Sequence, residues 1–270
     1  MNFEEFWTRG DVHERVKIAL KEANLLEKKL EIEDLFPLDQ YHARGIAATI
    51  ELADKLNFSK NSTIIDIGCG LGGPARYFSK RFNCNVYGID ITEAFIEIGN
   101  YFNKLTHIDH QVTLLKGDGE NLPYQTEFFD GAVSQHVTMN IENREQFFNE
   151  AFRVLKKGAI FGFSEHGLGT KGSPIFPLPW ADNEDMSFLK TPEYTKSLLK
   201  KIGFKNIKII STGEKYISGY NSLLKKGQSN EMPTLGIHVI GGDSMLERSK
   251  NSMRSIIENR TYPFEIICNR

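Results

Sequence analysis

The sequence predicts an α/β fold built on a doubly wound, mostly parallel sheet of seven strands. From residue 62 onward, short β-branched and apolar runs alternate with amphipathic segments at intervals of about 25 residues, as in βαβ units with right-handed crossovers. A glycine-rich loop interrupts this alternation directly after the first run. The composition, 40% hydrophobic and 25% charged, is that of an ordinary globular chain. We therefore expect one compact domain.

The expected domain has three parts. Residues 1–58 are predicted to form a helical N-terminal cover, because apolar residues recur at three- and four-residue spacings in 16–36 and 45–58. Residues 59–170 are predicted to form the core of the sheet. Residues 171–270 are expected to complete it, with substrate-covering loops and a helical insertion before the last strand.

Each expected strand is a short apolar run that ends at glycine or at an acidic residue, which suits strands buried on both faces. One helix is delimited by clear signals: Thr191 as N-cap, Pro192 at the first helical position and Gly203 at the C-terminus. The expected strands are 62–68, 85–90, 112–118, 129–134, 159–165, 206–212 and 264–268, and the helices among them are 74–82, 94–105, 144–158, 191–204 and 244–260.

Charge and composition exclude several classes of function. The 33 Lys and Arg nearly balance the 35 Asp and Glu, so nucleic-acid binding is not indicated. No run approaches the ~20 apolar residues of a membrane span, and the acidic start lacks the pattern of a signal peptide, so we predict a cytoplasmic protein. Three separated cysteines and the His107–His110 stretch do not predict a metal site. A homodimer stays open, because a covering helix and a dimer interface look alike in sequence.

Three acidic residues mark the expected ligand edge of the sheet. Asp66 ends the first strand, Asp90 ends the second and Asp118 follows the third. The carboxyl ends of parallel strands meet at one crevice, so all three should face one ligand. Gly68 and Gly70 lie in the turn after the first strand, where backbone must approach a ligand closely.

The position of Asp66 favours one cofactor over another. A dinucleotide such as NAD would place its pyrophosphate near this glycine loop, where it would repel the carboxylate. S-adenosylmethionine places an ammonium and a sulfonium there instead, and both would be attracted. Asp118 could accept a hydrogen bond from the adenine amino group, and Asp90 could bind the ribose hydroxyls.

Four segments carry a family resemblance. The stretches IIDIGCGLGGPARYFS, YGIDIT, GDGENLPY and RVLKKGAIFGFSEH resemble the class I S-adenosylmethionine-dependent methyltransferases, a Rossmann-like family. Within it, they are most similar to the small-molecule group with the ubiquinone/menaquinone and sarcosine/dimethylglycine enzymes. The resemblance covers residues 38–212 and implies the fold and the cofactor, but no particular substrate.

The resemblance also implies roles for individual residues. It puts two glycines and the first acid around the methionine moiety, and it puts further residues on the ribose, the adenine and the sulfonium. The segment LDQYHARG resembles a D-Q-[FY]-H-x-x-G element that closes over cofactor and substrate. The implied contacts are Asp66, Gly68 and Gly70 (methionine), Asp90 (ribose), Ile91, Asp118 and Gly119 (adenine), Gln135 (sulfonium), Tyr41 and His42 (lid) and Arg44 (lid and cofactor carboxylate).

The substrate side departs from those relatives. They commonly have an acid after Ser-Gln and a His later, whereas here His136 follows directly and Asn140 occupies the later region. We consider His136 the best candidate for a general base, because imidazole titrates near neutrality, with His166 weaker; each has a purely structural alternative. We also expect Met139, Asn140, Trp180, His42 and His238 to contribute to the substrate pocket, with ordinary packing as the alternative for Trp180 and His238.

Together these features predict an S-adenosylmethionine-dependent methyltransferase acting on an N, O or C atom of a small molecule. The chemistry needs chiefly proximity and orientation, because the leaving group is already activated. Two alternatives remain at this point: a nicotinamide-dependent oxidoreductase that uses the same glycine loop, and a non-catalytic S-adenosylmethionine-binding subunit.

Overall fold

The computed structural model describes residues 3–8, 10–27, 29–229, 232–242 and 244–270. At its centre lies one seven-stranded sheet with the strand order β3-β2-β1-β4-β5-β7-β6. The first five strands run parallel, and β7 runs antiparallel to both of its neighbours, which confirms the predicted doubly wound, mostly parallel sheet. The strands are β1 (Thr63–Ile67), β2 (Asn85–Asp90), β3 (Val112–Lys116), β4 (Phe129–Gln135), β5 (Leu155–Leu168), β6 (Lys205–Ser211) and β7 (Thr261–Asn269).

The sequence of β1 suits its place in the middle of the sheet. Ile64, Ile65 and Ile67 are fully buried. Side chains alternate between the faces of a strand, so Ile65 and Ile67 enter the core on one side and Ile64 enters the core on the other. An apolar run without polar alternation is what a strand covered on both faces requires.

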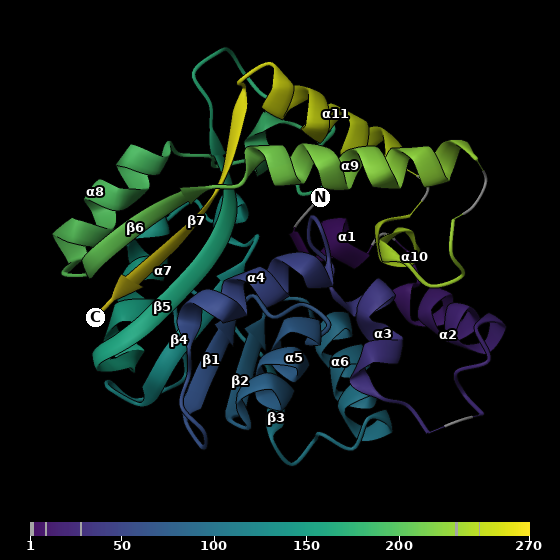
Figure 1. Cartoon of the computed structure of the whole chain (residues 1–270), viewed down its shortest axis with the longest axis horizontal. Coiled ribbons are helices and arrows are strands. Elements are labelled where there is room, and N and C mark those ends of the chain that lie inside the picture. Colours follow the sequence, from purple (N-terminus) through teal and green to yellow (C-terminus); the bar gives the residue numbers. More distant parts are fainter. Residues whose placement is uncertain (1–2, 9, 28, 230–231, 243) are drawn as a thin grey trace.

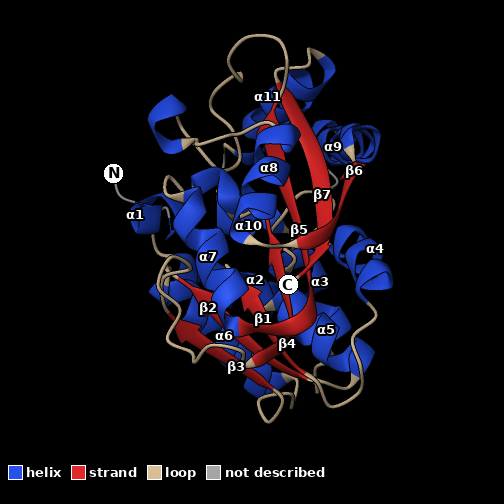
Figure 2. Cartoon of the chain, turned by 90° about the vertical axis from the view of Figure 1, so that its left-hand side faces the viewer, coloured by secondary structure: helices blue, strands red, loops and turns tan. Residues whose placement is uncertain are grey.

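Helices cover both faces of the sheet (Figure 2). On one face α4, α5 and α6 contribute to one hydrophobic core, and on the other α7 and α8 contribute to a second. These layers leave the carboxyl ends of the strands to be covered by other elements. The helices of the two layers are α4 (Ile46–Leu56), α5 (Gly73–Phe82), α6 (Glu93–Leu105), α7 (Arg144–Val154) and α8 (Pro192–Ile202).

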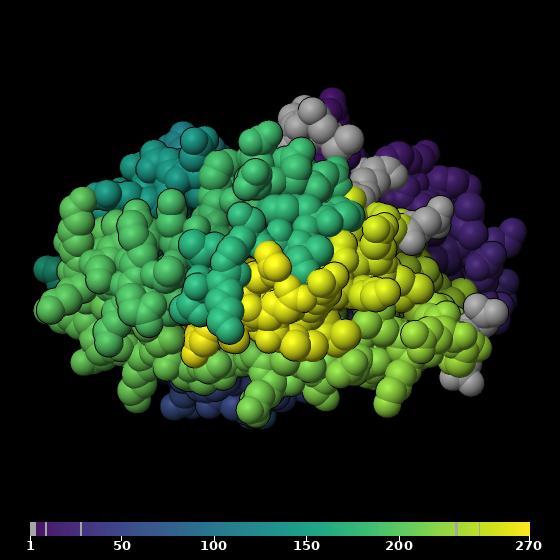
Figure 3. All heavy atoms as spheres, turned by 90° about the horizontal axis from the view of Figure 1, so that it is seen from above, coloured from purple at the N-terminus to yellow at the C-terminus, as the bar shows by residue number. Residues whose placement is uncertain are grey.

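The remaining helices gather at the carboxyl ends of the strands. Figure 1 shows α9 and α11 lying side by side above α10 and the N-terminal helices, and α2, α3 and α10 share a hydrophobic cluster with α6. Seen from above, green and yellow C-terminal segments form most of this face, with purple N-terminal segments at one end (Figure 3). These helices are α1 (Phe3–Thr8), α2 (Val12–Glu22), α3 (Ile32–Asp39), α9 (Gly213–Gln228), α10 (Ile237–Gly241) and α11 (Met245–Ile257).

The expected helix over 16–36 is two helices separated by a turn. Asn24 adopts a left-handed φ of 56° and ends the regular structure after α2. A capping box between Glu31 and Asp34 starts α3, which runs through Pro37 to Asp39, beyond the expected end at residue 36. The helical spacing of apolar residues continues through the turn between α2 and α3 and therefore does not reveal it. The capping box at Glu31 and Asp34 marks the start of the second helix more reliably.

The helix expected over 144–158 is shorter than predicted. It ends at Val154, and β5 begins at Leu155, four residues earlier than the expected strand. The pairing of β5 with β4 shifts register between Phe129 and Gly131, which marks an irregularity in the ladder. The first strand residues were hidden because two lysines and Gly158 separate Leu155 from the apolar run.

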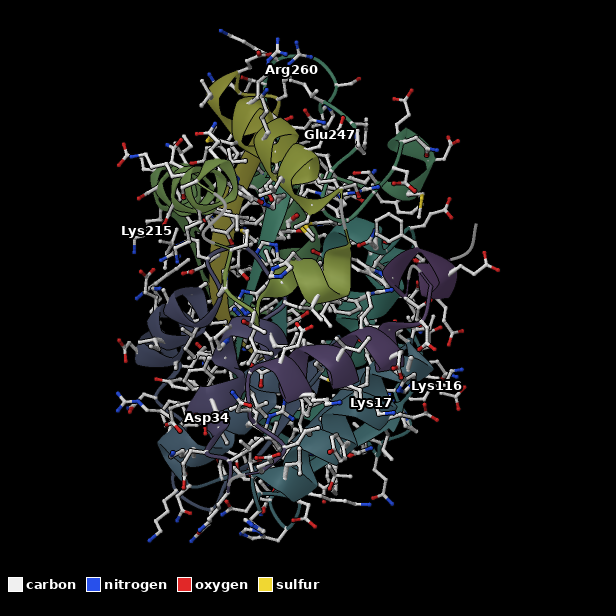
Figure 4. All side chains as sticks on the ribbon, turned by 90° about the vertical axis from the view of Figure 1, so that its right-hand side faces the viewer. Lys17, Asp34, Lys116, Lys215, Glu247 and Arg260 are labelled. Carbon is white, nitrogen blue, oxygen red and sulfur yellow. The ribbon has the colours of Figure 1, made fainter. Side chains whose placement is uncertain are left out.

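Two buried ion pairs connect a helix on the sheet to another element, one to the N-terminal cover and one to a strand. Arg76 Nη2 on α5 lies 2.9 Å from Asp39 Oδ2 at the end of α3, and Arg144 Nη1 on α7 lies 2.8 Å from Glu165 Oε2 on β5. All four side chains are at most 1% exposed, so each charge depends on its partner. Other charged side chains point outward at the periphery of the molecule in Figure 4, among them Lys17, Lys116, Lys215 and Glu247.

Candidate active site

A cavity of about 330 Å³ lies at the carboxyl ends of the parallel strands. The loops after β1, β2, β3 and β4 provide most of its wall, as expected for an open α/β sheet. The N-terminal cover adds Trp7 and Tyr41, α6 adds Phe95, and the loop after β5 adds Phe188. Its lining includes Trp7, Tyr41, Gly68, Gly70, Asp90, Ile91, Thr92, Phe95, Asp118, Gly119, Glu120, Gln135, His136, Asn140, Glu142 and Phe188.

The two predicted loop glycines line this cavity for different structural reasons. Gly68 has a φ of 79°, and a Cβ on it would lie 2.1 Å from Cγ2 of Val137, so no larger residue fits without displacement. Gly70 has a φ of 52°, and a Cβ there would meet no atom within 4 Å. Gly68 therefore makes room for the chain after β4, while Gly70 gives the backbone a left-handed turn beside open space.

Asp90 ties the loop after β1 to the loop after β2. Its Oδ2 accepts a hydrogen bond from the Gly70 N–H at 2.9 Å, and its Oδ1 accepts one from the Thr92 N–H at the same distance. Burial raises the pKa of Asp90, and these two hydrogen bonds oppose that rise. The carboxylate is thus held at the cavity wall by two backbone donors.

Asp66 lies beneath the loop and is not among the residues that line the cavity. It is 1% exposed, and its Oδ2 has no hydrogen-bond partner among the described residues. Burial, and then the neighbouring Asp90, raise the pKa of Asp66 to about 8. We expected this carboxylate to face the ligand directly; the alternation of β1 turns its side chain to the face covered by α4 and α5 instead.

Acidic residues line the end of the cavity that is formed by the loop after β3. Asp118 Oδ1 accepts a hydrogen bond from the Glu120 N–H at 2.8 Å, and Glu142 also lines this end. Burial, and then Asp118 and Glu142, raise the pKa of Glu120. With Asp90, the lining contains four carboxylates, and none of the described residues that form it is a lysine or an arginine.

At the end of β4, Gln135 and His136 face the cavity. Gln135 is 7% exposed, and its Nε2 has no hydrogen-bond partner among the described residues. His136 adopts a left-handed φ of 60°, unusual for a residue with a side chain, and its Nε2 lies 2.6 Å from the hydroxyl of Tyr216 on α9. The strand end therefore projects one amide and one imidazole toward the ligand side.

A smaller chamber of about 60 Å³ adjoins the cavity on the β5 side. Trp7, Tyr41 and His136 line both spaces, so the two are neighbours. His166 at the end of β5 stacks on Trp180 with ring centroids 4.6 Å apart. The remaining lining is His42, Ala43, Met139, Pro179, Tyr220, Ile237, Met245 and Ser249.

The three imidazoles of this chamber are held neutral. Burial lowers the pKa of His42 to about 4 and that of His166 to about 3. The pKa of His136 is also well below its ordinary value because of burial and then the nearby His166, His42 and Arg44. The ring of His136 stacks on His42, with centroids 5.8 Å apart. Near neutral pH the chamber is therefore polar but carries no imidazolium.

Comparison with known proteins agrees with this geometry. Residues 65–163 match a family model described as a methyltransferase domain. The matched segment extends from β1 into β5 and includes the glycine loop, Asp90, Asp118 and Gln135.

Individual relatives cover different shares of the chain. Sterol 24-C-methyltransferase of Candida albicans is 33% identical over 114 residues, which are 42% of this chain but only 30% of that protein. Sarcosine/dimethylglycine N-methyltransferase of Halorhodospira halochloris is 27% identical over 175 residues, 65% of this chain and 62% of that protein. The solved structure of Haemonchus contortus phosphoethanolamine N-methyltransferase 2 with S-adenosyl-L-methionine superposes with a TM-score of 0.79 at 17% identity, covering 100% of this chain and 60% of that one. The fold is that of a Rossmann-like methyltransferase.

Besides Asp66, two other predicted site residues line neither cavity. Arg44 does not line either space; its Nη2 is 2.5 Å from Glu51 Oε1, and its guanidinium lies over the ring of Tyr216. His238 on α10 also lines neither, although the adjacent Ile237 does. The structure therefore places neither side chain at the two cavities that we expected them to line: Arg44 is paired with Glu51, and α10 contributes Ile237 in place of His238.

Several lining residues were not predicted from the sequence. Trp7 comes from α1, and its ring contacts that of Tyr41 at 5.8 Å between centroids. Ser249 on α11 lines the chamber, and Tyr216, which lines neither cavity, contacts His136 through its hydroxyl. Trp7 is one of two tryptophans in the chain, which was the only signal available. The others lie in helices where only tertiary packing decides which face meets the site.

Three further findings concern the described residues as a whole. No group of three or more His, Cys, Asp or Glu side chains is arranged there to hold a metal ion. Across the same residues, every helix is too short or too polar to cross a bilayer. The three cysteines are free and buried.

The neutral state of His166 predicts a specific dependence of stability on pH. Between pH 7 and 5 the unfolded chain takes up a proton at this residue and the folded chain does not, so the free energy of unfolding falls as the pH falls. With an unfolded pKa near 6.5, this contribution is about 2 kcal/mol over that interval. We expect His166→Phe, which keeps a ring against Trp180, to lose about 2 kcal/mol less than the unaltered protein.

Guanidinium unfolding at the two pH values measures this difference. His110→Phe, at an exposed histidine between α6 and β3, is the matched control and should show the same loss as the unaltered protein. Equal losses for His166→Phe and the unaltered protein would mean that His166 is protonated in the folded state.

Proposed function

We propose that this protein transfers a methyl group from S-adenosylmethionine to an N, O or C atom of a small molecule. The lining of the 330 Å³ cavity carries the proposal, because it has four carboxylates and no described lysine or arginine. A cofactor with an ammonium and a sulfonium suits such a wall, whereas the pyrophosphate of NAD does not. The methyltransferase family model supports the same conclusion and weighs against a nicotinamide-dependent oxidoreductase.

The residues at the cavity fit the cofactor. Asp90 would bind the ribose hydroxyls, because its carboxylate lies at the wall between two backbone donors. Asp118 and Gly119 would contact the adenine edge and Ile91, half exposed at the rim, its ring. The unpartnered Nε2 of Gln135 would face the methionine part. The bound cofactor supplies a methyl group on a positively charged sulfur.

Orientation is the main task of the chain's own side chains. Methyl transfer is an in-line displacement, and correct placement of the acceptor provides most of the acceleration. The chamber beyond β4 lies next to Gln135 and His136, where that placement has to occur. Because its pKa is so low, His136 is a weak proton acceptor near pH 7, so we assign it to positioning the acceptor, with Tyr216 holding its ring.

Calorimetric titration with S-adenosylmethionine, S-adenosylhomocysteine and NAD in one buffer tests the cofactor. We expect micromolar affinity for the two sulfur compounds, about 8 kcal/mol, and no binding of NAD. Binding of NAD alone would contradict the proposal.

A methyl-transfer screen with labelled donor then separates an enzyme from a non-catalytic binding subunit. Turnover of any small molecule, lost in His136→Ala without loss of cofactor affinity, would support catalysis. Cofactor binding with no turnover of any tested acceptor would favour the non-catalytic subunit. The cytoplasmic location, the homodimer and the three-part division of the chain remain predictions.

A further inference from the structure

We propose that the 60 Å³ chamber beyond β4 and β5 selects a methyl acceptor whose inserted end is uncharged and both donates and accepts hydrogen bonds, such as a hydroxyl, an amide or a ring N–H. This inference rests on the proposed function, since it names the class of acceptor for that reaction. Amino acids and phosphate esters, which would insert an ion, are excluded from this class.

The position of the chamber links it to the reacting methyl group. Along the sheet the order is β3, β2, β1, β4, β5, and the acidic end of the larger cavity lies over β2 and β3. The chamber lies over the opposite end, with His136 following β4 and His166 ending β5. A group in the chamber therefore approaches the cofactor from the Gln135 side, away from the adenine end.

Two fully enclosed polar groups in the chamber lack partners. His166 is 0% exposed, and neither of its ring nitrogens has a hydrogen-bond partner among the described residues. Ser249 is 1% exposed, and its hydroxyl is likewise unpartnered. A neutral imidazole has one donor and one acceptor nitrogen, and leaving both buried and unpaired costs free energy. A ligand group that both donates and accepts would satisfy them.

No charged side chain of the described chain lines the chamber. Two cations next to its lining residues in sequence are paired, Arg44 with Glu51 and Arg248 with Asp182, and Lys250 beside Ser249 is exposed. The charges of Arg144 and Glu165, next to His166, are likewise paired with each other. An ion of either sign in the chamber would be desolvated without a counter-charge, which is strongly unfavourable.

Most residues that line the chamber lie outside the segment that matches the methyltransferase family model. Only His136 and Met139 of its lining fall within the matched residues 65–163, while Trp180, Tyr220 and Ser249 lie outside them. The acidic cavity shows the opposite distribution, with most of its lining inside that range. The acceptor class therefore has to be inferred from the chamber itself, and the charged acceptors named for the relatives do not transfer to it.

Three isosteric probes test the proposal: acetamide, acetate and acetamidinium, which are neutral, anionic and cationic near pH 7.5. Their affinities are measured by ligand-observed NMR on the full chain, with and without saturating S-adenosylhomocysteine. We expect acetamide to bind at least about tenfold more tightly than either ion, because only acetamide can both donate and accept without carrying charge. In His166→Phe this preference should disappear while the affinity for S-adenosylhomocysteine stays unchanged. Ser249→Ala is a milder change and should also lower the affinity for acetamide.

The outcomes separate this inference from the proposed function. If S-adenosylhomocysteine fails to bind, the proposed function is wrong. The probe affinities measured without S-adenosylhomocysteine still test the selectivity of the chamber. Tighter binding of acetate would overturn the inference and point to the unpartnered Nη1 of Arg44. Equal or tighter binding of acetamidinium, no binding of any probe, or an acetamide affinity unaffected by both variants would overturn it as well. His110→Phe is the control for the aromatic substitution and should leave all affinities unchanged.

Discussion

Arg144→Met is expected to lower the free energy of unfolding by about 3–5 kcal/mol, the usual cost of breaking a buried ion pair from one side. Arg144 donates to both carboxylate oxygens of Glu165, at 3.0 and 2.8 Å, and to the carbonyl oxygens of Thr138 and Phe188. The substitution leaves the Glu165 carboxylate buried without its counter-charge. Because Phe188 lines the cavity and Glu165 precedes His166, the site should loosen together with the fold.

Urea unfolding followed by circular dichroism measures this effect. Arg81→Met is the matched control, since its pair with Asp54 is about half exposed and 3.3 Å long, and it should change stability by less than about 1 kcal/mol. The double variant Arg144→Met with Glu165→Gln should recover part of the loss, because no unpaired charge remains. Equal effects of Arg144→Met and Arg81→Met would show that the buried pair contributes no more than a surface pair.

Asp90→Ala is expected to weaken binding of S-adenosylmethionine by at least about 100-fold. The loss has two sources: the carboxylate hydrogen bonds to the ribose, each contributing about 1.5–3 kcal/mol, and the release of the Gly70 and Thr92 N–H groups that shape the loop. Asp90→Asn keeps the shape without the charge and should fall between the alanine variant and the unaltered protein.

Calorimetry on the three proteins gives the affinities, and thermal unfolding without ligand shows whether each variant is folded. Asp109→Ala, at an exposed loop position before β3, should bind with unchanged affinity. If folded Asp90→Ala retains an affinity within about threefold, a change below about 0.7 kcal/mol, the assignment of the ribose to this carboxylate is wrong.

The residues expected at the cofactor end of the site can be recognised from short local motifs in the sequence. Gly68, Gly70, Asp90 and Asp118 each stand at the end of a strand or in the loop that follows it, and parallel strands bring those ends to one edge. The class of the sheet followed from the same alternation of apolar runs and helices. The class of the sheet and the cofactor could therefore be predicted without coordinates.

The 60 Å³ chamber, by contrast, depends on contacts between distant segments. Tyr216 holds His136 across 80 residues, and Ser249 reaches the chamber from α11. Helical periodicity shows that such residues lie on a helix, but it does not show which neighbour the helix face will meet. For the same reason the local motif predicted that Arg44 binds the cofactor, whereas in the structure Arg44 forms an ion pair with Glu51 on α4.

The sequence by itself thus determined the fold class and the cofactor-binding edge, because both depend on residues close together along the chain. Only the tertiary structure decided that Asp66 is buried away from the cavity lining and that the 60 Å³ chamber contains three neutral imidazoles and no charged lining residue among those described. Burial and pairing set these properties, and both arise when segments far apart in sequence pack against each other.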